Sequence, residues 1–205
     1  MTTTLQIPDQ GQLCRVRRVQ ALTILWMSVE AVVALAAAWM ARSPAMLAFG
    51  GDSAVELFSA VVVLWAFGGR SNWRDAEAQA ARIAGILLVL LAIYVAVVAA
   101  KAVLGHAEPR PTYVGIAILV AAAVIMPWLA KEKRALSAAM GSAALRADAA
   151  ESALCAYLSL IALAGVALNA AWRIWWADPL AALVILPLVI WEARQALRGR
   201  ACGCC

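Results

Sequence analysis

Four side chains that can bind a metal ion are spaced one helical turn apart on two apolar segments. Asp52 and Glu56 lie four residues apart in one segment, and Glu151 and Cys155 lie four apart in another. Residues with this spacing share one face of a helix. Two carboxylates one turn apart repel each other in a low-dielectric medium unless they share a proton or a cation. Three carboxylates and one thiolate form a ligand set that a tetrahedral Zn²⁺-like ion accepts.

The second of these segments carries a longer polar stripe. Asp148, Glu151, Ser152, Cys155 and Ser159 all fall on one helical face. Asp148 is either an accessory ligand or proton relay of the site, or an acid that favours a helix N-terminus in headgroup water. A place near a helix end in headgroup water is also the alternative for Asp52, Glu56 and Glu151. Cys155 is either a thiolate ligand or a small apolar filler, which is the usual role of a lone membrane cysteine.

Two further acids lie in apolar segments. Glu30 is midway along the first segment and is either a proton relay or accessory ligand, or a neutral or paired group. Glu192 is close to Arg194 at the end of the last segment, and we interpret it as interfacial.

The remaining cysteines lie near the two chain termini. Cys14 precedes the first apolar segment, and Cys202, Cys204 and Cys205 end the chain. As a thiol cluster they could capture a soft metal ion in the cytosol; the alternative is an unselected tail. His106, the only histidine, is interpreted as a loop residue.

The composition indicates that these residues are held by membrane-spanning helices. Hydrophobic residues make up 65% of the 205 and charged residues 14%, against roughly 45–50% and about 25% in soluble domains. Long apolar runs favour helices over a barrel. The sequence therefore predicts an all-α integral membrane protein with six transmembrane helices, at 21–41, 46–67, 83–103, 113–130, 149–170 and 178–193.

Charge sets the expected topology and domain division. Basic residues concentrate on the side that would hold both termini, which predicts cytoplasmic termini by the positive-inside rule. The run Lys131-Glu132-Lys133-Arg134 is interpreted as such a topology marker. We expect a cytoplasmic tail at 1–20 without a signal peptide, a transmembrane domain at 21–197 and a Cys-rich tail at 198–205. Asp178-Pro179 is typical of a helix N-cap followed by proline.

Three stretches resemble the transmembrane domain of the cation diffusion facilitator, or cation efflux, family. They are FGGDSAVELFS at 49–59, ALRADAAE at 144–151 and ADPLAA at 177–182, and the likeness runs over about 21–197. The individual motifs are short, but their order and their placement on the helices are more specific. The resemblance implies a reduced form without the cytoplasmic ferredoxin-like domain and the His-rich loop.

The resemblance also implies which residues bind the metal. Family members pair two ligands from the second helix with two from the fifth, which correspond here to Asp52, Glu56, Glu151 and Cys155. Glu151 and Cys155 stand where the family usually has His or Asp and then Asp. A homodimeric exporter of divalent metal, driven by proton antiport with alternating access, is the implied activity.

Ligand chemistry is consistent with that activity. Carboxylates and thiols bind metal only when deprotonated, so protons compete with the ion. A thiolate favours Zn²⁺ or Cd²⁺ over Mg²⁺ or Ca²⁺. We therefore expect a multi-pass protein of the cell (inner) membrane that transports Zn²⁺, with Cd²⁺ or Co²⁺ as alternatives, has no resident cofactor and is not an enzyme. The competing hypotheses are a membrane metal sensor or scaffold, and a metal-dependent membrane enzyme.

Overall fold

The computed structural model describes residues 10–66, 73–105, 108–110, 112–140 and 143–198. Within these residues the chain forms six helices and no strand, which confirms the all-α prediction. The helices are α1 (Gln10–Ala41), α2 (Pro44–Ala66), α3 (Trp73–Leu104), α4 (Tyr113–Met140), α5 (Ala143–Trp172) and α6 (Ala177–Leu197).

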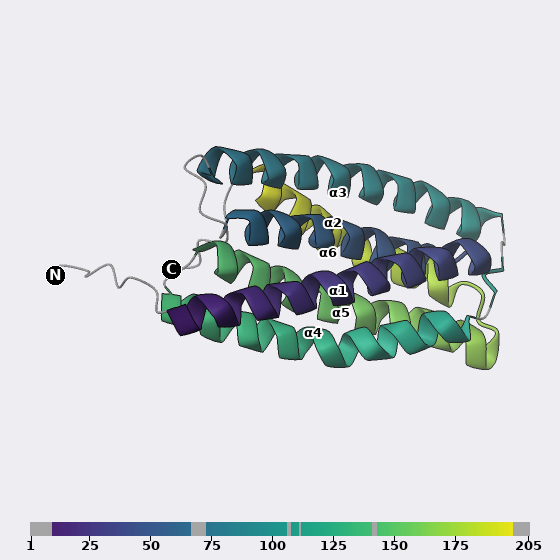
Figure 1. Ribbon diagram of the computed structural model, residues 1–205. Helices are drawn as coiled ribbons and strands as arrows, with labels where there is room; N and C mark the ends of the chain where they lie inside the picture. Colours follow the sequence, from purple (N-terminus) through teal and green to yellow (C-terminus); the bar gives the residue numbers. More distant parts are fainter. Residues whose placement is uncertain (1–9, 67–72, 106–107, 111, 141–142, 199–205) are drawn as a thin grey trace.

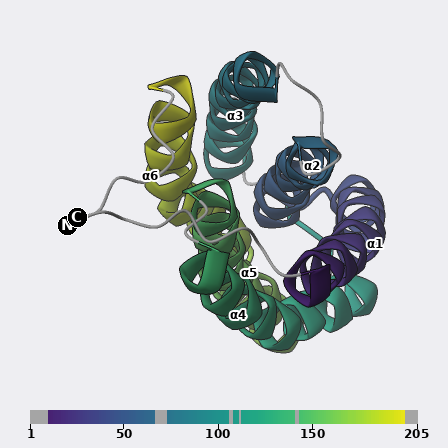
Figure 2. The same cartoon turned by 60° about the vertical axis from the view of Figure 1, so that its left-hand side comes forward.

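The helices lie lengthwise beside one another in an elongated bundle (Figure 1). Helix α2 packs against α1, α3, α5 and α6, while α4 packs against α1 and α5. Helix α3 packs against α6. These two helices lie on one side of the group formed by α1, α2, α4 and α5 (Figure 2). Helices α2 and α5 are therefore direct neighbours, as the proposed ligand set requires.

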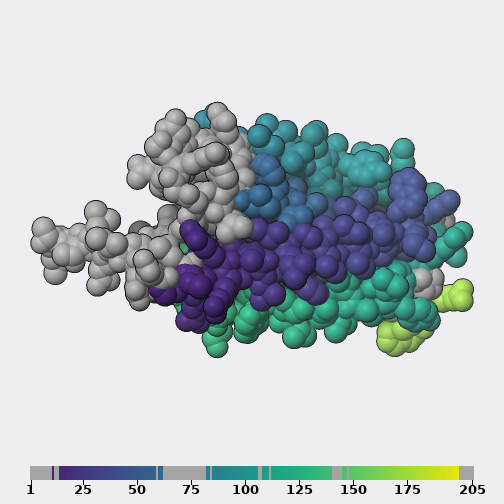
Figure 3. All heavy atoms as spheres, in the orientation of Figure 1, coloured from purple at the N-terminus to yellow at the C-terminus, as the bar shows by residue number. Residues whose placement is uncertain are grey.

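Large apolar side chains cover the outside of the bundle. Figure 3 shows α1 and α4 running side by side along one face. Leu25 and Val32 of α1 and Val124 of α4 are among the large apolar side chains that are exposed. Soluble proteins rarely expose apolar surface on this scale. Among the residues that the structure describes, five helices, α1 and α3 to α6, are long and apolar enough to cross a membrane. The chain is thus a multi-pass membrane protein, and a sixth span through α2 stays a prediction.

The helices are longer than predicted at one end of the bundle. Helix α1 begins at Gln10 instead of residue 21, α3 begins at Trp73 instead of 83, and α4 ends at Met140 instead of 130. The predicted ranges are those of the membrane-spanning segments, and hydropathy marks only the apolar part of a helix. Polar contacts continue the helices beyond it, as where Arg15 Nη2 donates to Glu132 Oε2 at 2.7 Å.

The start of α6 differs from its prediction. Asp178 does not cap α6, which begins at Ala177 with Trp176 at the N-cap and no side-chain cap. Instead, the buried Asp178 carboxylate accepts hydrogen bonds from the Ser43 hydroxyl and from the Ala45 backbone N–H, the latter at 3.1 Å. These donors lie at the start of α2, where helical N–H groups lack partners within the helix. Asp178 therefore ties α6 to the α1–α2 turn.

Replacing Asp178 should destabilise the bundle. In Asp178→Ala the Ser43 hydroxyl and the Ala45 N–H lose their buried acceptor, which should lower the free energy of unfolding by about 2–4 kcal/mol. Thermal unfolding in detergent measures this, with Glu108→Ala as the control because Glu108 is an exposed acid between α3 and α4. Equal stability of the two variants would contradict the assignment.

Candidate metal centre

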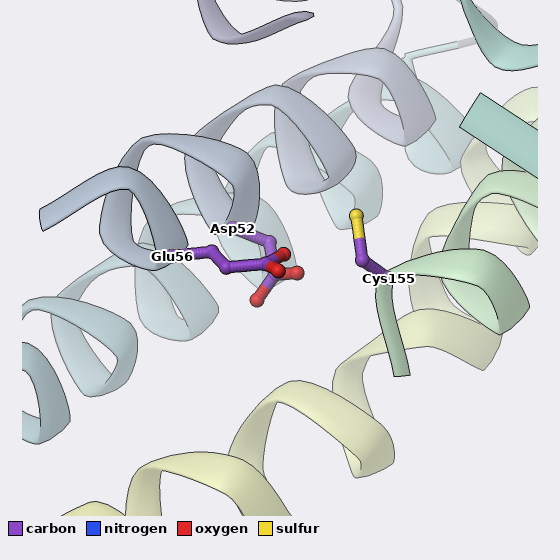
Figure 4. A group of neighbouring side chains, drawn as sticks. All are labelled: Asp52, Glu56 and Cys155. Carbon is purple, nitrogen blue, oxygen red and sulfur yellow. The ribbon is translucent and has the colours of Figure 1, made fainter. Parts of the chain in front are cut away.

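Asp52, Glu56 and Cys155 come together inside the bundle. One ligand atom from each lies within 4.8 Å of the others. Asp52 and Glu56 are each 4% exposed and Cys155 is 0% exposed. Figure 4 shows the two carboxylates on the side of α2 that faces α5, with Cys155 on the neighbouring face of α5. The one-turn spacing thus places both acids of α2 beside the thiol.

A glycine brings α1 close to this part of α2. A Cβ atom on Gly50 would lie 3.0 Å from the Ala34 Cβ and 3.0 Å from the Leu35 backbone nitrogen. Close helix packing in membranes commonly relies on such small residues. Because α1 sits this near, its acid Glu30 reaches the ligand group.

Glu30 is fully buried next to the thiol. Its Oε1 atom accepts hydrogen bonds from Ser53 Oγ at 2.7 Å and from Cys155 Sγ at 3.4 Å. Its Oε2 atom has no hydrogen-bond partner, although the Trp26 indole lies close by. Glu30 therefore contacts one predicted ligand directly, a placement that both the relay and the accessory-ligand hypotheses require.

Glu151 lies at the edge of this arrangement. It is half-buried one turn before Cys155 on α5, and it is close enough to Asp52 and Glu56 for their charges to repel. Among the described residues, however, the group within 4.8 Å contains Asp52, Glu56 and Cys155 without Glu151. The structure brings three of the four predicted ligands together and leaves the fourth beside them.

Glu192 is a functional candidate that the sequence interpretation missed. Its side chain lies within hydrogen-bonding reach of Asp52 and near Glu56 and Glu151, and its Oε2 atom is buried without a partner. The interfacial interpretation was therefore wrong. Its seven-residue spacing from the buried Ile185 was the available signal, because that spacing places Glu192 close to the inner face of α6.

A buried ion pair adjoins the ligand group. Lys133 Nζ donates to Asp148 Oδ1 at 2.9 Å, with the two side chains 0% and 1% exposed. Asp148 Oδ2 accepts a further hydrogen bond from Gln20 Nε2 at 2.6 Å. The alternative that placed Asp148 in headgroup water was wrong. The topology-marker interpretation was also wrong for Lys133, although Lys131 and Arg134 are exposed as it requires.

The centre holds more acids than nearby cations. Five carboxyl groups from α1, α2, α5 and α6 lie close to one another here, three of them beside the Cys155 thiol, and Lys133 is the described cation that offsets their charge. They are Glu30, Asp52, Glu56, Glu151 and Glu192. A carboxyl group inside a membrane protein is stable when it carries a proton and is neutral, or when it is ionised and paired with a cation. The arrangement can therefore bind either protons or a cation.

The other candidate sulfur and nitrogen ligands lie away from this centre or outside the described residues. Cys14 is exposed near the start of α1. His106, Cys202, Cys204 and Cys205 fall outside the residues that the structure describes. The proposed cytosolic capture cluster stays a prediction.

Comparison with known proteins gives one family. The model of the cation efflux transmembrane domain matches residues 21–199, which is most of the chain. A comparison with curated proteins finds no significant match. The matched stretch contains the five carboxyl groups of the centre, Cys155 and the Lys133–Asp148 pair.

Proposed function

Because the chain belongs to the cation efflux transmembrane domain family, we propose that it exports a divalent transition metal ion as a secondary active transporter. Zn²⁺ is the first candidate substrate, and Cd²⁺ and Co²⁺ are the alternatives. The observation that carries this proposal is the meeting of Asp52, Glu56 and Cys155 in the interior of the bundle. Two carboxylates and a thiolate from neighbouring helices form most of a tetrahedral site for such an ion.

The proposed fourth ligand is Glu151. It lies one turn from Cys155 on the same helix. It is also close enough to Asp52 and Glu56 for electrostatic repulsion between the carboxylates. Its entry into the coordination shell would require α5 to approach α2 more closely or the Glu151 side chain to change rotamer. A metal ion attracts all four groups at once, so its binding supplies the free energy for that rearrangement.

The hydrogen bond between Cys155 and Glu30 supports a proton-coupled mechanism. A thiol must lose its proton to bind metal, and Glu30 Oε1 is the carboxylate oxygen that accepts a hydrogen bond from Cys155 Sγ. In the proposed step the metal–sulfur bond forms as the S–H bond breaks, and the proton passes to Glu30. Glu30 would then release this proton to the side from which the metal came, and when the metal leaves on the far side the sulfur would take up a proton from that side. Asp148 is also a relay candidate, through its contacts with Lys133.

The remaining parts of the proposal follow the family resemblance. Alternating access would expose the centre to one side of the membrane at a time, with both termini in the cytoplasm of a cell (inner) membrane. A homodimer would form through the membrane helices. Cys14 and the Cys-rich tail would gather metal on the cytosolic side.

Transport by the purified protein tests this proposal. Protein reconstituted into liposomes with a metal-sensitive dye inside and an imposed pH gradient should move Zn²⁺ or Cd²⁺ and dissipate the gradient as it does so. Liposomes without protein provide the baseline. A chain that binds metal but moves none would be a sensor or scaffold, and that result would overturn the transporter proposal.

Changing Cys155 should alter the choice of metal. Cys155→Asp replaces the thiolate with the carboxylate that the family more often has at this position, and a hard oxygen ligand binds the soft Cd²⁺ less well than sulfur does. We expect the ratio of Cd²⁺ to Zn²⁺ transport to fall about 10-fold while Zn²⁺ transport persists. Competition between the two ions in the same liposomes measures the ratio. An unchanged ratio would show that Cys155 is not a ligand.

A further inference from the structure

A continuous chain of buried hydrogen bonds leads from Gln20 of α1 to the proposed ligand Glu56. Gln20 donates to Asp148, Lys133 donates to both Asp148 and Ser152, and Ser152 Oγ donates to Glu56 Oε1. The distances are 2.6 Å, 2.9 Å, 2.7 Å and 3.0 Å in that order. Each of the five side chains is at most 4% exposed. The chain joins α1, α4, α5 and α2.

Lys133 determines where the Ser152 hydroxyl proton points. A hydroxyl group has one proton to donate and accepts through its lone pairs. Because the Lys133 ammonium has only donors, it must bond to a Ser152 lone pair, at 2.7 Å. The hydroxyl proton of Ser152 therefore points away from Lys133, and Ser152 donates it to Glu56 Oε1. The pair thus presents a fixed donor to the carboxylate.

This donor leaves one oxygen of Glu56 for a metal ion. Oε1 accepts from Ser152, whereas Oε2 is buried and has no hydrogen-bond partner in the structure. Glu56 also belongs to the group of ligand atoms with Asp52 and Cys155. A carboxylate that is held through one oxygen and open at the other is oriented for monodentate metal binding.

We infer that Ser152 and Lys133 are positioning residues for the metal ligand Glu56. Ser152 holds the carboxylate, Lys133 orients Ser152, and Asp148 with Gln20 holds Lys133. Outer-shell partners of this kind fix ligand orientation, and their loss typically weakens metal binding by about 10–100-fold. The inference rests on the proposed function, since it assigns a role within the same site.

Cobalt spectroscopy on Ser152→Ala tests the positioning role. The variant keeps the Lys133–Asp148 pair and removes only the hydroxyl that holds Glu56. Co²⁺ added to the full-length protein in detergent should give a thiolate-to-metal charge-transfer band from Cys155 and the intense visible bands of a tetrahedral site. In Ser152→Ala we expect the charge-transfer band to remain, the visible bands to weaken, and the dissociation constant for Co²⁺ to rise about 10-fold.

Two further variants separate positioning from a general effect on folding. Ser159→Ala is the matched control, because Ser159 is also buried on α5 but donates only to the backbone oxygen of Ala156 in its own helix; it should resemble the wild type. Ser152→Thr retains the hydroxyl and should restore most of the affinity and the visible bands.

The experiment distinguishes a wrong positioning role for Ser152 from a wrong metal site. If Ser152→Ala has the affinity and spectrum of the wild type, or loses only thermal stability, the positioning role is overturned. If the wild type gives no thiolate band with Co²⁺, the proposed metal site is wrong and the positioning role falls with it. A weakened, less tetrahedral spectrum in Ser152→Ala alone supports the inference.

Discussion

Glu56→Gln is expected to abolish metal transport. The change removes a charged ligand from the group formed with Asp52 and Cys155 while it preserves the volume of the side chain. An amide oxygen is a weaker ligand for Zn²⁺ than a carboxylate, and it carries no charge to offset that of the ion. We expect the rate of Zn²⁺ entry into proteoliposomes to fall by about 100-fold or more, since even outer-shell changes cost 10–100-fold in affinity.

The control for this experiment is a chemically identical change at the surface. Glu132→Gln alters an acid of α4 whose described partner is the exposed Arg15, and it should transport at the wild-type rate. Both variants should be recovered as folded protein in detergent, because Glu56 Oε2 has no partner to lose. Transport by Glu56→Gln at the rate of Glu132→Gln would remove Glu56 from the site.

Lys133→Met is expected to cause the largest loss of stability. Lys133 is fully buried and its ammonium group is paired with the buried Asp148 carboxylate. Removal of one partner of a buried ion pair leaves an uncompensated charge and typically costs about 3–5 kcal/mol. The free energy of unfolding, or the unfolding temperature in detergent, should therefore fall far more than for Lys131→Met, which alters an exposed neighbour.

A second change in the same pair checks the cause. Lys133→Met combined with Asp148→Asn removes both charges of this ion pair, and the amide oxygen can still accept from Gln20. The double variant should recover a substantial part of the stability that Lys133→Met loses, which appears as coupling in a double-mutant cycle. Strictly additive losses would mean that the ion pair does not explain the effect.

The helices and the central ligands were predictable because their signals are local. Apolar length identifies a spanning helix, and a four-residue spacing places Asp52 and Glu56 on one face whatever the rest of the chain does. The polar ends of α1, α3 and α4 were not predicted, because these helices continue into residues of low hydropathy.

The surroundings of the centre were less predictable because they depend on contacts between distant segments. Lys133 lies in a run of charges that resembles a topology marker, and only the packing of α4 on α5 buries it against Asp148. Glu192 lies near the end of α6, yet α6 crosses α2 and brings it to Asp52. Asp178 follows the pattern of an N-cap for its own helix but caps a different one. Sequence spacing within one helix carries no information on these partners.

X-ray absorption at the zinc edge tests the central claim most directly. The claim is that a metal ion binds inside the bundle through Asp52, Glu56 and Cys155, with Glu151 as the proposed fourth ligand. Protein loaded with one equivalent of Zn²⁺ should show one sulfur at about 2.3 Å and oxygen ligands at about 2.0–2.2 Å, and the sulfur should vanish in Cys155→Ser while remaining in Cys14→Ser. A coordination shell of several sulfurs, or one unchanged by Cys155→Ser, would contradict the account and place the metal elsewhere.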